Sequence, residues 1–469
     1  MYTFDTNKYF IIKFLESWKN KNGNVNSTSN LLNWIKDLNK TIFARVKECN
    51  IQDSTFWFYD DYNGEVLNRK RSFFSIKGIR RFENDKLISE QPIIIQPEIG
   101  YLGIICKEID GVMNFLMQAK VEPGNVNCVQ ISPTIQATKS NFTRAHGGKL
   151  PTYFEYFDNS WKYNVIYDQI QSEQSTRFYK KRNRNMIMEI DDDIEVYSNY
   201  KWMTLGQIKE FMKIDNLVNM DTRTVLSGIP FVTTRFSEEE LIYIESIFTD
   251  KVLFNSIFKT SEINDIANIF QYINNYKMLH EVNNVIVPLN QLVDWKVTDQ
   301  GITCIKNASF MVRYYNISIS GREIQNWTQP LFKAIGKATF GLISCVVGKT
   351  RKFLVAARPE IGSFDKIEIG PSIQLESTHN SYYDNEVESL FRKNVENKKS
   401  ILLDVILSEE GGRFYHEQNR NVIIEIDIND ISNLPKQYFW VDYSTLNFLI
   451  QVNNCLNIQL RNLLSLLEV

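Results

Sequence analysis

Histidine, cysteine, proline and glycine are all scarce in this chain, whose 469 residues include 4 His, 6 Cys, 11 Pro and 20 Gly. The cysteines form no Cys-x-x-Cys pair, and none stands at zinc-ligand spacing from a histidine. We therefore expect reduced thiols and no zinc site. The low proline and glycine content also argues against a disordered or low-complexity chain.

Neither sign of charge predominates, since 53 basic and 55 acidic side chains give a formal net charge of -2. A nucleic acid or an anionic membrane surface would need a basic patch, so we expect neither as a partner. No segment approaches the roughly 20 apolar residues that span a bilayer. Residues 1–13 contain Asp5 and lack the apolar run of a signal peptide. We therefore predict a cytoplasmic protein.

The most informative feature is an internal repeat, with an offset of 238 residues (329 minus 91) over most of the chain and 236 (413 minus 177) over one segment. Similarity that keeps its order over this length indicates a duplicated domain, because solenoid units are far shorter. We predict one repeat in residues 1–230 and a second in 231–469. The matching pairs include, in order, Gln91 and Gln329, Gly103 and Gly341, Pro133 and Pro371, Arg177 and Arg413, Trp202 and Trp440, and Arg223 and Arg461.

Each repeat combines short apolar runs bounded by Gly and Pro, typical of strands, with a closing segment of helical periodicity. The pattern predicts an α+β fold with added helices at the N-terminus and between the repeats. Strands are expected at 102–106, 115–119, 129–131, 186–190 and 422–426, and helices at 205–212, 443–449, within 9–38 and within 237–276.

Long motifs in both repeats resemble NDP-hexose 2,3-dehydratases, and the resemblance covers nearly the whole chain, duplication included. The motifs are FLMQAKVEPGN (115–125), ISPTIQATKSNFTRAHGGK (131–149), QSEQSTRFYKKRNRNMIMEI (171–190), WMTLGQIKEFMKIDNLVNMDTRTVLS (202–227) and SEEGGRFYHEQNRN (408–421).

The resemblance implies two tandem Nudix-like mixed-sheet modules, a homodimer, and action on an NDP-4-keto-6-deoxyglucose. The nucleotide is usually dTDP in that family, with CDP and GDP left open by the residues. The Glu-rich Nudix box is absent from this sequence, so we expect no catalytic metal. We expect no other cofactor, because the reaction involves no redox change and no Gly-rich dinucleotide fingerprint is present.

In such a reaction the 4-ketone acidifies the hydrogen on C3, and the resulting enolate expels the C2 hydroxyl. The enol product ketonises to a 3,4-diketo-2,6-dideoxy sugar, which a downstream 3-ketoreductase could take over. The enzyme needs a base near H3, a donor at the C4 oxygen and an acid for the departing hydroxyl. It also needs a clamp for the diphosphate, for which arginine is well suited.

Three residues are candidates for these catalytic roles. His146 precedes Gly147 and Gly148, which would let the backbone approach a ligand closely, and a histidine titrates near neutrality. Lys120 and Glu122 stand at alternate positions of a predicted strand and should share a face. The simpler alternatives are a packed loop histidine and a surface ion pair. The residues do not assign base and acid among the three.

Candidate substrate-binding residues fall into two groups. Gln136, Thr138, Ser140 and Asn141 follow strand alternation and could bind the sugar or base, or simply form the polar face of a strand. The basic run is the candidate diphosphate clamp, although a run of bases can equally be a solvated or fold-stabilising face. It comprises Arg177, Arg182, Asn183, Arg184 and Asn185, to which we add Arg144 beside the candidate histidine.

The second repeat has counterparts of some of these candidate site residues. Arg358 stands where the first repeat has Lys120, so the charge is kept but the amine is not. This favours one active pocket in the first repeat and a second pocket that only binds nucleotide or is vestigial. The second set is Arg358, Glu360, Gln374, Arg413, Asn419 and Arg420. Trp57 and Trp327 could stack on a nucleobase, although a core position is the simpler interpretation.

Two other function classes remain as alternatives to a dehydratase. A Nudix-type nucleotide-sugar hydrolase is disfavoured by the missing metal-binding carboxylates. A non-catalytic nucleotide-sugar binding protein is disfavoured by the presence of Lys120, Glu122 and His146 in the first repeat.

Overall fold

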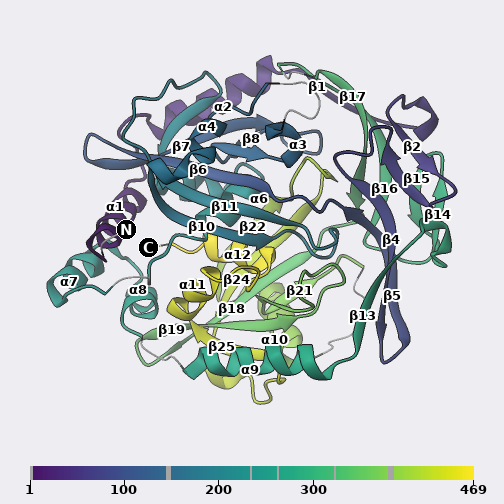
Figure 1. Cartoon of the computed structure of the whole chain (residues 1–469). Helices are drawn as coiled ribbons and strands as arrows, with labels where there is room; N and C mark the ends of the chain where they lie inside the picture. Colours follow the sequence, from purple (N-terminus) through teal and green to yellow (C-terminus); the bar gives the residue numbers. More distant parts are fainter. Residues whose placement is uncertain are drawn as a thin grey trace.

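A computed structural model describes residues 4–143, 149–232, 235–260, 264–321, 324–378 and 385–468. The chain forms two large mixed sheets and two smaller, mainly antiparallel outer sheets. Figure 1 shows the two large sheets one above the other, with the outer sheets gathered along one side of both.

The two large sheets have the same strand order. In the first, β11 runs parallel to β6 and the other neighbours are antiparallel, and in the second β24 and β18 form the equivalent parallel pair. The first contains β10 (Asn164–Ser172), β11 (Arg182–Glu189), β6 (Gly100–Ile109), β7 (Val112–Val121), β12 (Tyr200–Thr204), β8 (Val129–Ser132) and β9 (Ile135–Ala137). The second contains β22 (Ile401–Ser408), β24 (Gln418–Ile426), β18 (Thr339–Val347), β19 (Thr350–Arg358), β25 (Tyr438–Asp442), β20 (Glu368–Pro371) and β21 (Ile373–Leu375).

The outer sheets exchange strands between the repeats. β1 (Ala44–Cys49), from the first repeat, pairs with β16 of the second, and β13 (Val282–Val287), at the corresponding place in the second repeat, pairs with β4 of the first. Neither outer sheet is therefore built by one repeat alone. The remaining strands are β2 (Trp57–Asp60), β3 (Glu65–Asn68), β4 (Ser75–Glu83) and β5 (Lys86–Ile95), then β14 (Trp295–Thr298), β15 (Gly301–Cys304), β16 (Phe310–Ile319), β17 (Asn326–Ala334) and β23 (Phe414–Tyr415).

The helices begin where polar residues cap them. Ser27 caps α2, and Ser237 and Asp250 cap α7 and α8 by accepting backbone N–H bonds. The helices are α1 (Phe4–Lys19), α2 (Thr28–Thr41), α3 (Lys139–Phe142), α4 (Phe154–Asp158), α5 (Leu205–Met212), α6 (Met220–Leu226), α7 (Glu238–Ile247), α8 (Lys251–Phe258), α9 (Asn264–Leu279), α10 (Glu386–Glu396), α11 (Tyr443–Ile450) and α12 (Ile458–Ser465).

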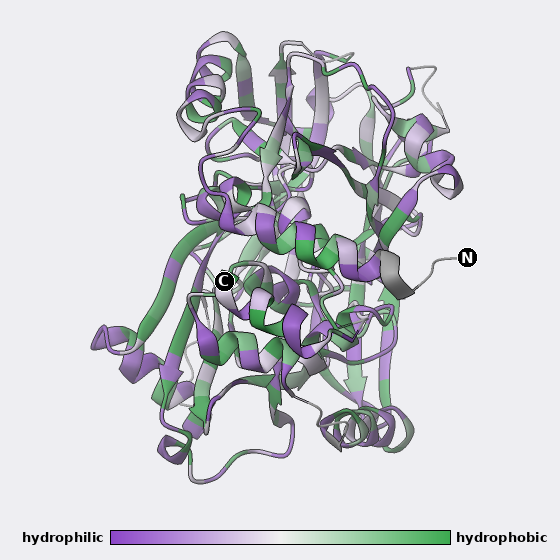
Figure 2. Ribbon diagram, turned by 90° about the vertical axis from the view of Figure 1, so that its left-hand side faces the viewer, coloured by the Kyte–Doolittle hydropathy of each residue, from purple (hydrophilic) through white to green (hydrophobic). Residues whose placement is uncertain are grey.

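The main hydrophobic core runs continuously through both repeats. The apolar face of α1, with Phe14 fully buried, packs against β7 and α5, while α6 and α12 pack against each other between the large sheets. Figure 2 shows the helices banded in hydrophilic and hydrophobic residues, as expected for helices buried on one face. The halves therefore share a core as well as strands.

The structure confirms the mixed α and β architecture and the predicted strands and helices, most of which extend a few residues further than expected. The helical stretch 9–38 is two helices and 237–276 is three, because the capping residues above divide them. The Nudix-like character of the modules and the division at residue 230 stay predictions. None of the described helices is long and apolar enough to cross a membrane.

Candidate active site

A cavity of about 1370 Å³ opens at the end of strands β7 and β9, and both repeats line it. Its far wall comes from the hairpin of β16 and β17 and from the loop after β22, both in the second repeat. The cavity is larger than most small-molecule pockets, which hold roughly 300–1,000 Å³. It can therefore accept an extended polar ligand of the size of a sugar nucleotide.

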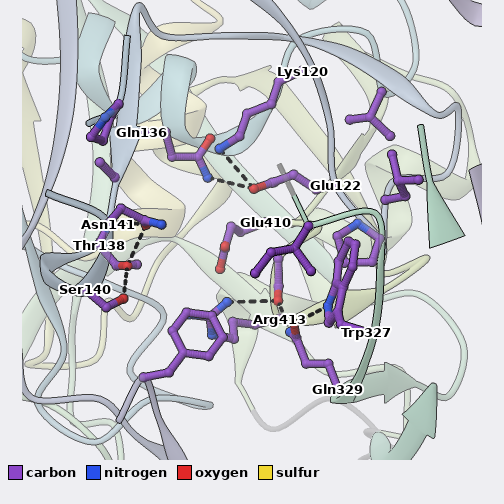
Figure 3. Close-up of a pocket in the computed structure, with 18 of the residues that line it drawn as sticks. Lys120, Glu122, Gln136, Thr138, Ser140, Asn141, Trp327, Gln329, Glu410 and Arg413 are labelled. Atoms are coloured by element: carbon purple, nitrogen blue, oxygen red, sulfur yellow. Dashed lines mark hydrogen bonds and ion pairs between the residues drawn. The ribbon is translucent and has the colours of Figure 1, made fainter. Parts of the chain in front are cut away.

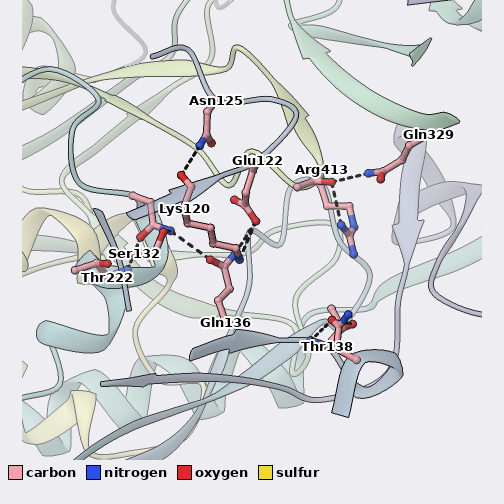
Figure 4. Close-up of polar contacts among 12 residues, drawn as sticks. Lys120, Glu122, Asn125, Ser132, Gln136, Thr138, Thr222, Gln329 and Arg413 are labelled. Atoms are coloured by element: carbon pink, nitrogen blue, oxygen red, sulfur yellow. Dashed lines mark hydrogen bonds and ion pairs between the residues drawn. The ribbon is translucent and has the colours of Figure 1, made fainter. Parts of the chain in front are cut away.

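Lys120 and Glu122 form a buried ion pair at the wall of this cavity. Lys120 Nζ lies 3.1 Å from Glu122 Oε1, and the two side chains are only 16% and 8% exposed. Gln136 Nε2 donates to the same carboxylate at 3.1 Å (Figure 4). Asn219 Nδ2 in turn donates to Gln136 Oε1 at 3.4 Å. The prediction that Lys120 and Glu122 share a face is confirmed, and the pair is buried instead of lying on the surface.

Thr138, Ser140 and Asn141 also line the cavity, but the expected strand alternation is wrong beyond residue 137. Residues 139–142 form the short helix α3, because Thr138 and Asn141 close a capping box around its first turn. Thr138 Oγ1 lies 2.9 Å from Ser140 Oγ, and this polar turn faces the cavity in Figure 3.

Several ionisable residues that the sequence did not single out also line the cavity. Burial raises the pKa of Glu410 to about 7, raises the pKa of Glu173, and raises the pKa of Asp221 well above its ordinary value. Burial likewise lowers the pKa of Lys181, whose Nζ donates to the carbonyl of Glu98 at 2.6 Å. The sequence signal for Glu410 was its mismatch with Gln174, its counterpart in the first repeat.

Arg413, which was assigned to the second pocket, lines the first cavity instead. Its Nε and Nη2 donate to Gln96 Oε1 at 3.2 and 3.0 Å, and its guanidinium stacks on Phe73 and Phe74, 4.3 and 4.6 Å from their ring centroids. Only 5% of the residue is exposed. The second repeat thus supplies an oriented cation to the cavity of the first.

Both tryptophans suggested for base stacking line the cavity, but they differ in burial. Trp57 belongs to a core cluster and is 2% exposed, whereas Trp327 is only half-buried. Trp327 Nε1 donates to Gln329 Oε1 at 3.2 Å, and Gln329 Nε2 donates to the carbonyl of Gly412 at 2.6 Å. Trp327 is therefore the more exposed of the two rings in the cavity wall.

Most of the basic run lies outside the cavity. Arg177 pairs with Glu376 at 3.1 Å, Arg182 stacks on Phe364, and Arg184 pairs with Asp168 across β10 and β11. Asn183 is the one member of this run that lines the cavity, and its Nδ2 holds Glu173 Oε2 at 2.7 Å. Asn185 Nδ2 donates to the carbonyl of Asn183.

The second repeat uses its matching residues mainly for internal contacts. Arg358 Nη2 donates to the carbonyls of Pro371 and Ser372 at 3.0 and 2.5 Å. Gln374 donates to Glu360 at 2.5 Å, and burial raises the pKa of Glu360 to about 7. Asn419 donates to Glu409 at 2.5 Å, and Arg420 pairs with Asp404. These contacts correspond to those of Asn183 with Glu173 and of Arg184 with Asp168 in the first repeat.

His146 and Arg144 lie outside the described residues, so their predicted roles stay predictions. Asn141 before this segment and Lys149 after it both line the cavity. Within the part of the chain that the structure describes, no group of three or more His, Cys, Asp or Glu side chains is arranged to hold a metal ion.

A lysine, several carboxyl groups and hydrogen-bonding amides around one cavity are the equipment of an acid–base enzyme. The NDP-hexose 2,3-dehydratase family model matches residues 28–229 and again 266–467. Similar curated proteins are named dTDP-4-dehydro-6-deoxy-alpha-D-glucopyranose 2,3-dehydratase. They come from Saccharopolyspora spinosa (36% identity over 88% of this chain and 85% of the relative), Streptomyces violaceoruber (32%, 94% and 97%) and Amycolatopsis orientalis (33%, 93% and 89%).

This chain belongs to the NDP-hexose 2,3-dehydratase family, a family of hydro-lyases, as its motifs predicted. The two matched segments coincide with the two repeats, so the family model also describes the duplication.

Proposed function

We propose that the protein is an NDP-4-keto-6-deoxyglucose 2,3-dehydratase and that the nucleotide is dTDP. The observation that carries the proposal is the buried Lys120–Glu122 pair in a cavity large enough for a sugar nucleotide. The names of the three relatives, which cover most of this chain, support dTDP as the nucleotide.

Lys120 and Glu122 together suit the first step of the reaction, the removal of H3 next to the 4-ketone. The Lys120 ammonium would stand at the C4 oxygen, where negative charge develops when H3 is removed. Glu122 is held by the Lys120 ammonium and the Gln136 amide, and would take H3 as the base. Gln136, Thr138, Ser140 and Asn141 would hold the sugar hydroxyls.

The remaining contacts would orient the nucleotide. Arg413 is a fixed cation for the diphosphate, and Trp327 offers a half-buried ring for the base. Arg144 and His146 remain proposals for the same pocket. We also propose a cytoplasmic homodimer, supported by the resemblance alone. A reductase for the 3-ketone is a further proposal, supported by the reactivity of the diketone product.

The proposal is tested by incubating metal-stripped protein with dTDP-4-keto-6-deoxyglucose and an aromatic ortho-diamine, which traps vicinal diketones. We expect a trapped sugar nucleotide one water lighter than the substrate, by mass spectrometry, with EDTA present. Parallel reactions with the GDP and CDP sugars measure nucleotide preference. Magnesium-dependent release of a nucleoside monophosphate would instead identify a hydrolase.

A further inference from the structure

We propose that Glu410, contributed by the second repeat, is the catalytic acid in the cavity of the first repeat and protonates the departing C2 hydroxyl. The inference rests on the proposed dehydratase function and adds a residue to it. Figure 3 shows the Glu410 carboxyl group inside the cavity, between the Lys120–Glu122 pair and Arg413.

The geometry around Gly412 places Glu410 close to Glu122. A methyl group on Gly412 would lie 2.2 Å from Glu410 Oε1 and 3.5 Å from Glu122 Oε1. The two carboxyl groups therefore flank the same glycine and face the same small volume. Within the described residues, the Glu410 carboxyl has neither a hydrogen bond nor an ion pair, so it is available to a ligand.

The loop that carries Glu410 is held against the first repeat by several contacts. Gly124 N–H, from the first repeat, donates to the carbonyl of Gly411 at 2.7 Å. On the other side of the loop, Gln329 Nε2 from β17 of the second repeat donates to the carbonyl of Gly412 at 2.6 Å. Arg223 Nη2, fully buried, donates to the carbonyl of Ser408 at 2.9 Å. Because its backbone is anchored on both sides, the loop holds the carboxyl group in a defined position.

The duplication supplies an internal comparison. The first repeat has Gln174, Ser175 and Thr176 where the second has Glu410, Gly411 and Gly412. Glu410 and the two glycines that let it approach Glu122 thus occur together in the loop that enters the first cavity. The counterpart loop of the first repeat has none of the three. The counterpart loop carries a neutral amide and enters the second repeat, where Arg358 replaces Lys120.

The proton balance closes without any further reactant. Glu122 takes H3, the C2–O bond breaks as Glu410 gives its proton to the oxygen, and water leaves. The enol then ketonises: Glu122 returns its proton to C2, and Glu410 takes the proton of the C3 hydroxyl. Both carboxyl groups end in their starting states, and the net change is the loss of one water.

The ionisation of Glu410 suits this role. Burial raises its pKa to about 7, so a large fraction is protonated at neutral pH, and an acid is most effective with a pKa near the working pH. The charged groups that face it come from several elements. They are Lys120 at the end of β7, Glu122 just after it, Glu173 and Lys181 between β10 and β11, Asp221 on α6, and Arg413 on its own loop.

Glu410→Gln tests the inference, because the side chain keeps its shape and the same turn carries glutamine in the first repeat. We expect kcat to fall roughly 10²- to 10⁴-fold while dTDP affinity stays within about 3-fold. In D₂O the variant should still exchange H3 of the substrate, measured by proton NMR against an enzyme-free blank. Glu122→Gln should lose both exchange and elimination.

The pH profile gives a second readout. The kcat of the wild type should fall as pH rises through about 7, since the required acid form is lost, and this limb should be absent from the residual activity of Glu410→Gln. Glu410→Asp should recover part of the rate. Glu396→Gln, on the exposed end of α10, is the surface control and should match the wild type.

Elimination by Glu410→Gln within about 3-fold of the wild type would overturn the inference. Loss of H3 exchange together with elimination would also overturn it, because the residue would then act before the hydroxyl leaves. A wild type that does not dehydrate the substrate would instead reject the proposed function, and the inference with it.

Discussion

Lys120 and Arg358 stand at corresponding positions at the ends of β7 and β19, yet their side chains do different things. Lys120 reaches the cavity and pairs with Glu122, whereas the Arg358 guanidinium turns back onto the carbonyls of Pro371 and Ser372. The cation therefore faces the cavity in the first repeat and its own backbone in the second.

Lys120→Arg should inactivate the enzyme although it keeps the charge. The new guanidinium would bind the equivalent carbonyls of Pro133 and Thr134 and leave the position that we propose for the C4 oxygen contact. We expect kcat to fall about 100-fold or more, measured in the diketone-trapping assay.

Lys333→Arg is the matched control, because Lys333 pairs with Glu48 at the surface, far along β17 from the site. It should leave kcat and stability unchanged. A Lys120→Arg enzyme within about 3-fold of the wild type would mean that only the positive charge at this position matters.

Among single residues, the sequence identified Lys120, Glu122 and Gln136 because they follow strand alternation within long family motifs. It did not identify Glu410, Glu173, Asp221 or Lys181. All four line one cavity, but Glu410 is far along the chain from the other three. Arg413 was assigned to the wrong pocket because the loop after β22 reaches into the first repeat, as the loop after β10 reaches into the second.

Among the elements, the loop after β22 contacts the first repeat at Gly124, and the loop after β10 contacts the second repeat at Gly362. Gly124 N–H bonds to Gly411 and Gly362 N–H bonds to Ser175, and a Cβ on Gly124 would lie 1.6 Å from the carbonyl oxygen of Phe414. The backbone of Gly124 is not in the left-handed region, so close approach alone requires glycine here.

Gly124→Ala should therefore displace the loop that carries Glu410. We expect a loss of about 3 kcal/mol in the free energy of unfolding, from denaturant titration, and at least a tenfold fall in kcat. Gly111→Ala is the control: its Cβ would meet nothing within 4 Å, although its φ is +80°. It should cost about 1 kcal/mol and leave kcat unchanged, whereas equal effects of the two variants would contradict the argument.

Apolar periodicity predicted the positions of the helices and strands well, because most of them are buried on one face and show a clear pattern of apolar residues. The helix 205–212 was predicted at its observed bounds, and the predicted strands 102–106 and 115–119 lie at the centres of β6 and β7. Ser140 and Asn141 were placed on a strand and lie on α3, because the capping box of Thr138 and Asn141 outweighs three residues of alternating polarity.

At the scale of the whole molecule, two buried arginines join the repeats. Arg223 donates to the carbonyl of Ser408 and to Asn462, and Arg461 donates to the carbonyl of Ser172 and to Gln171, so each reaches from its own repeat into the other. Burial lowers the pKa of Arg223 to about 10. Together with the exchanged strands β1 and β13, these bonds fix the loop of the second repeat in the first cavity.

Arg223→Met should lower the free energy of unfolding by about 3–5 kcal/mol, because the buried carbonyls and amide would lose their donor. Urea titration followed by circular dichroism measures this loss, and kcat should fall with it. Arg420→Met removes a half-exposed pair with Asp404 and should cost at most about 1 kcal/mol. Similar losses in the two variants would show that Arg223 does not hold the repeats together.

Local patterns, similarity at a constant offset and contiguous motifs were enough to predict the duplication, the α+β elements, the family and a shared face for Lys120 and Glu122. They did not reveal that each repeat completes the other. In the folded chain β1 and β13 are exchanged, and the loop of Glu410 and Arg413 lies in the cavity of the first repeat. This cavity is made by contacts between residues hundreds of positions apart, and periodicity carries no information about such contacts.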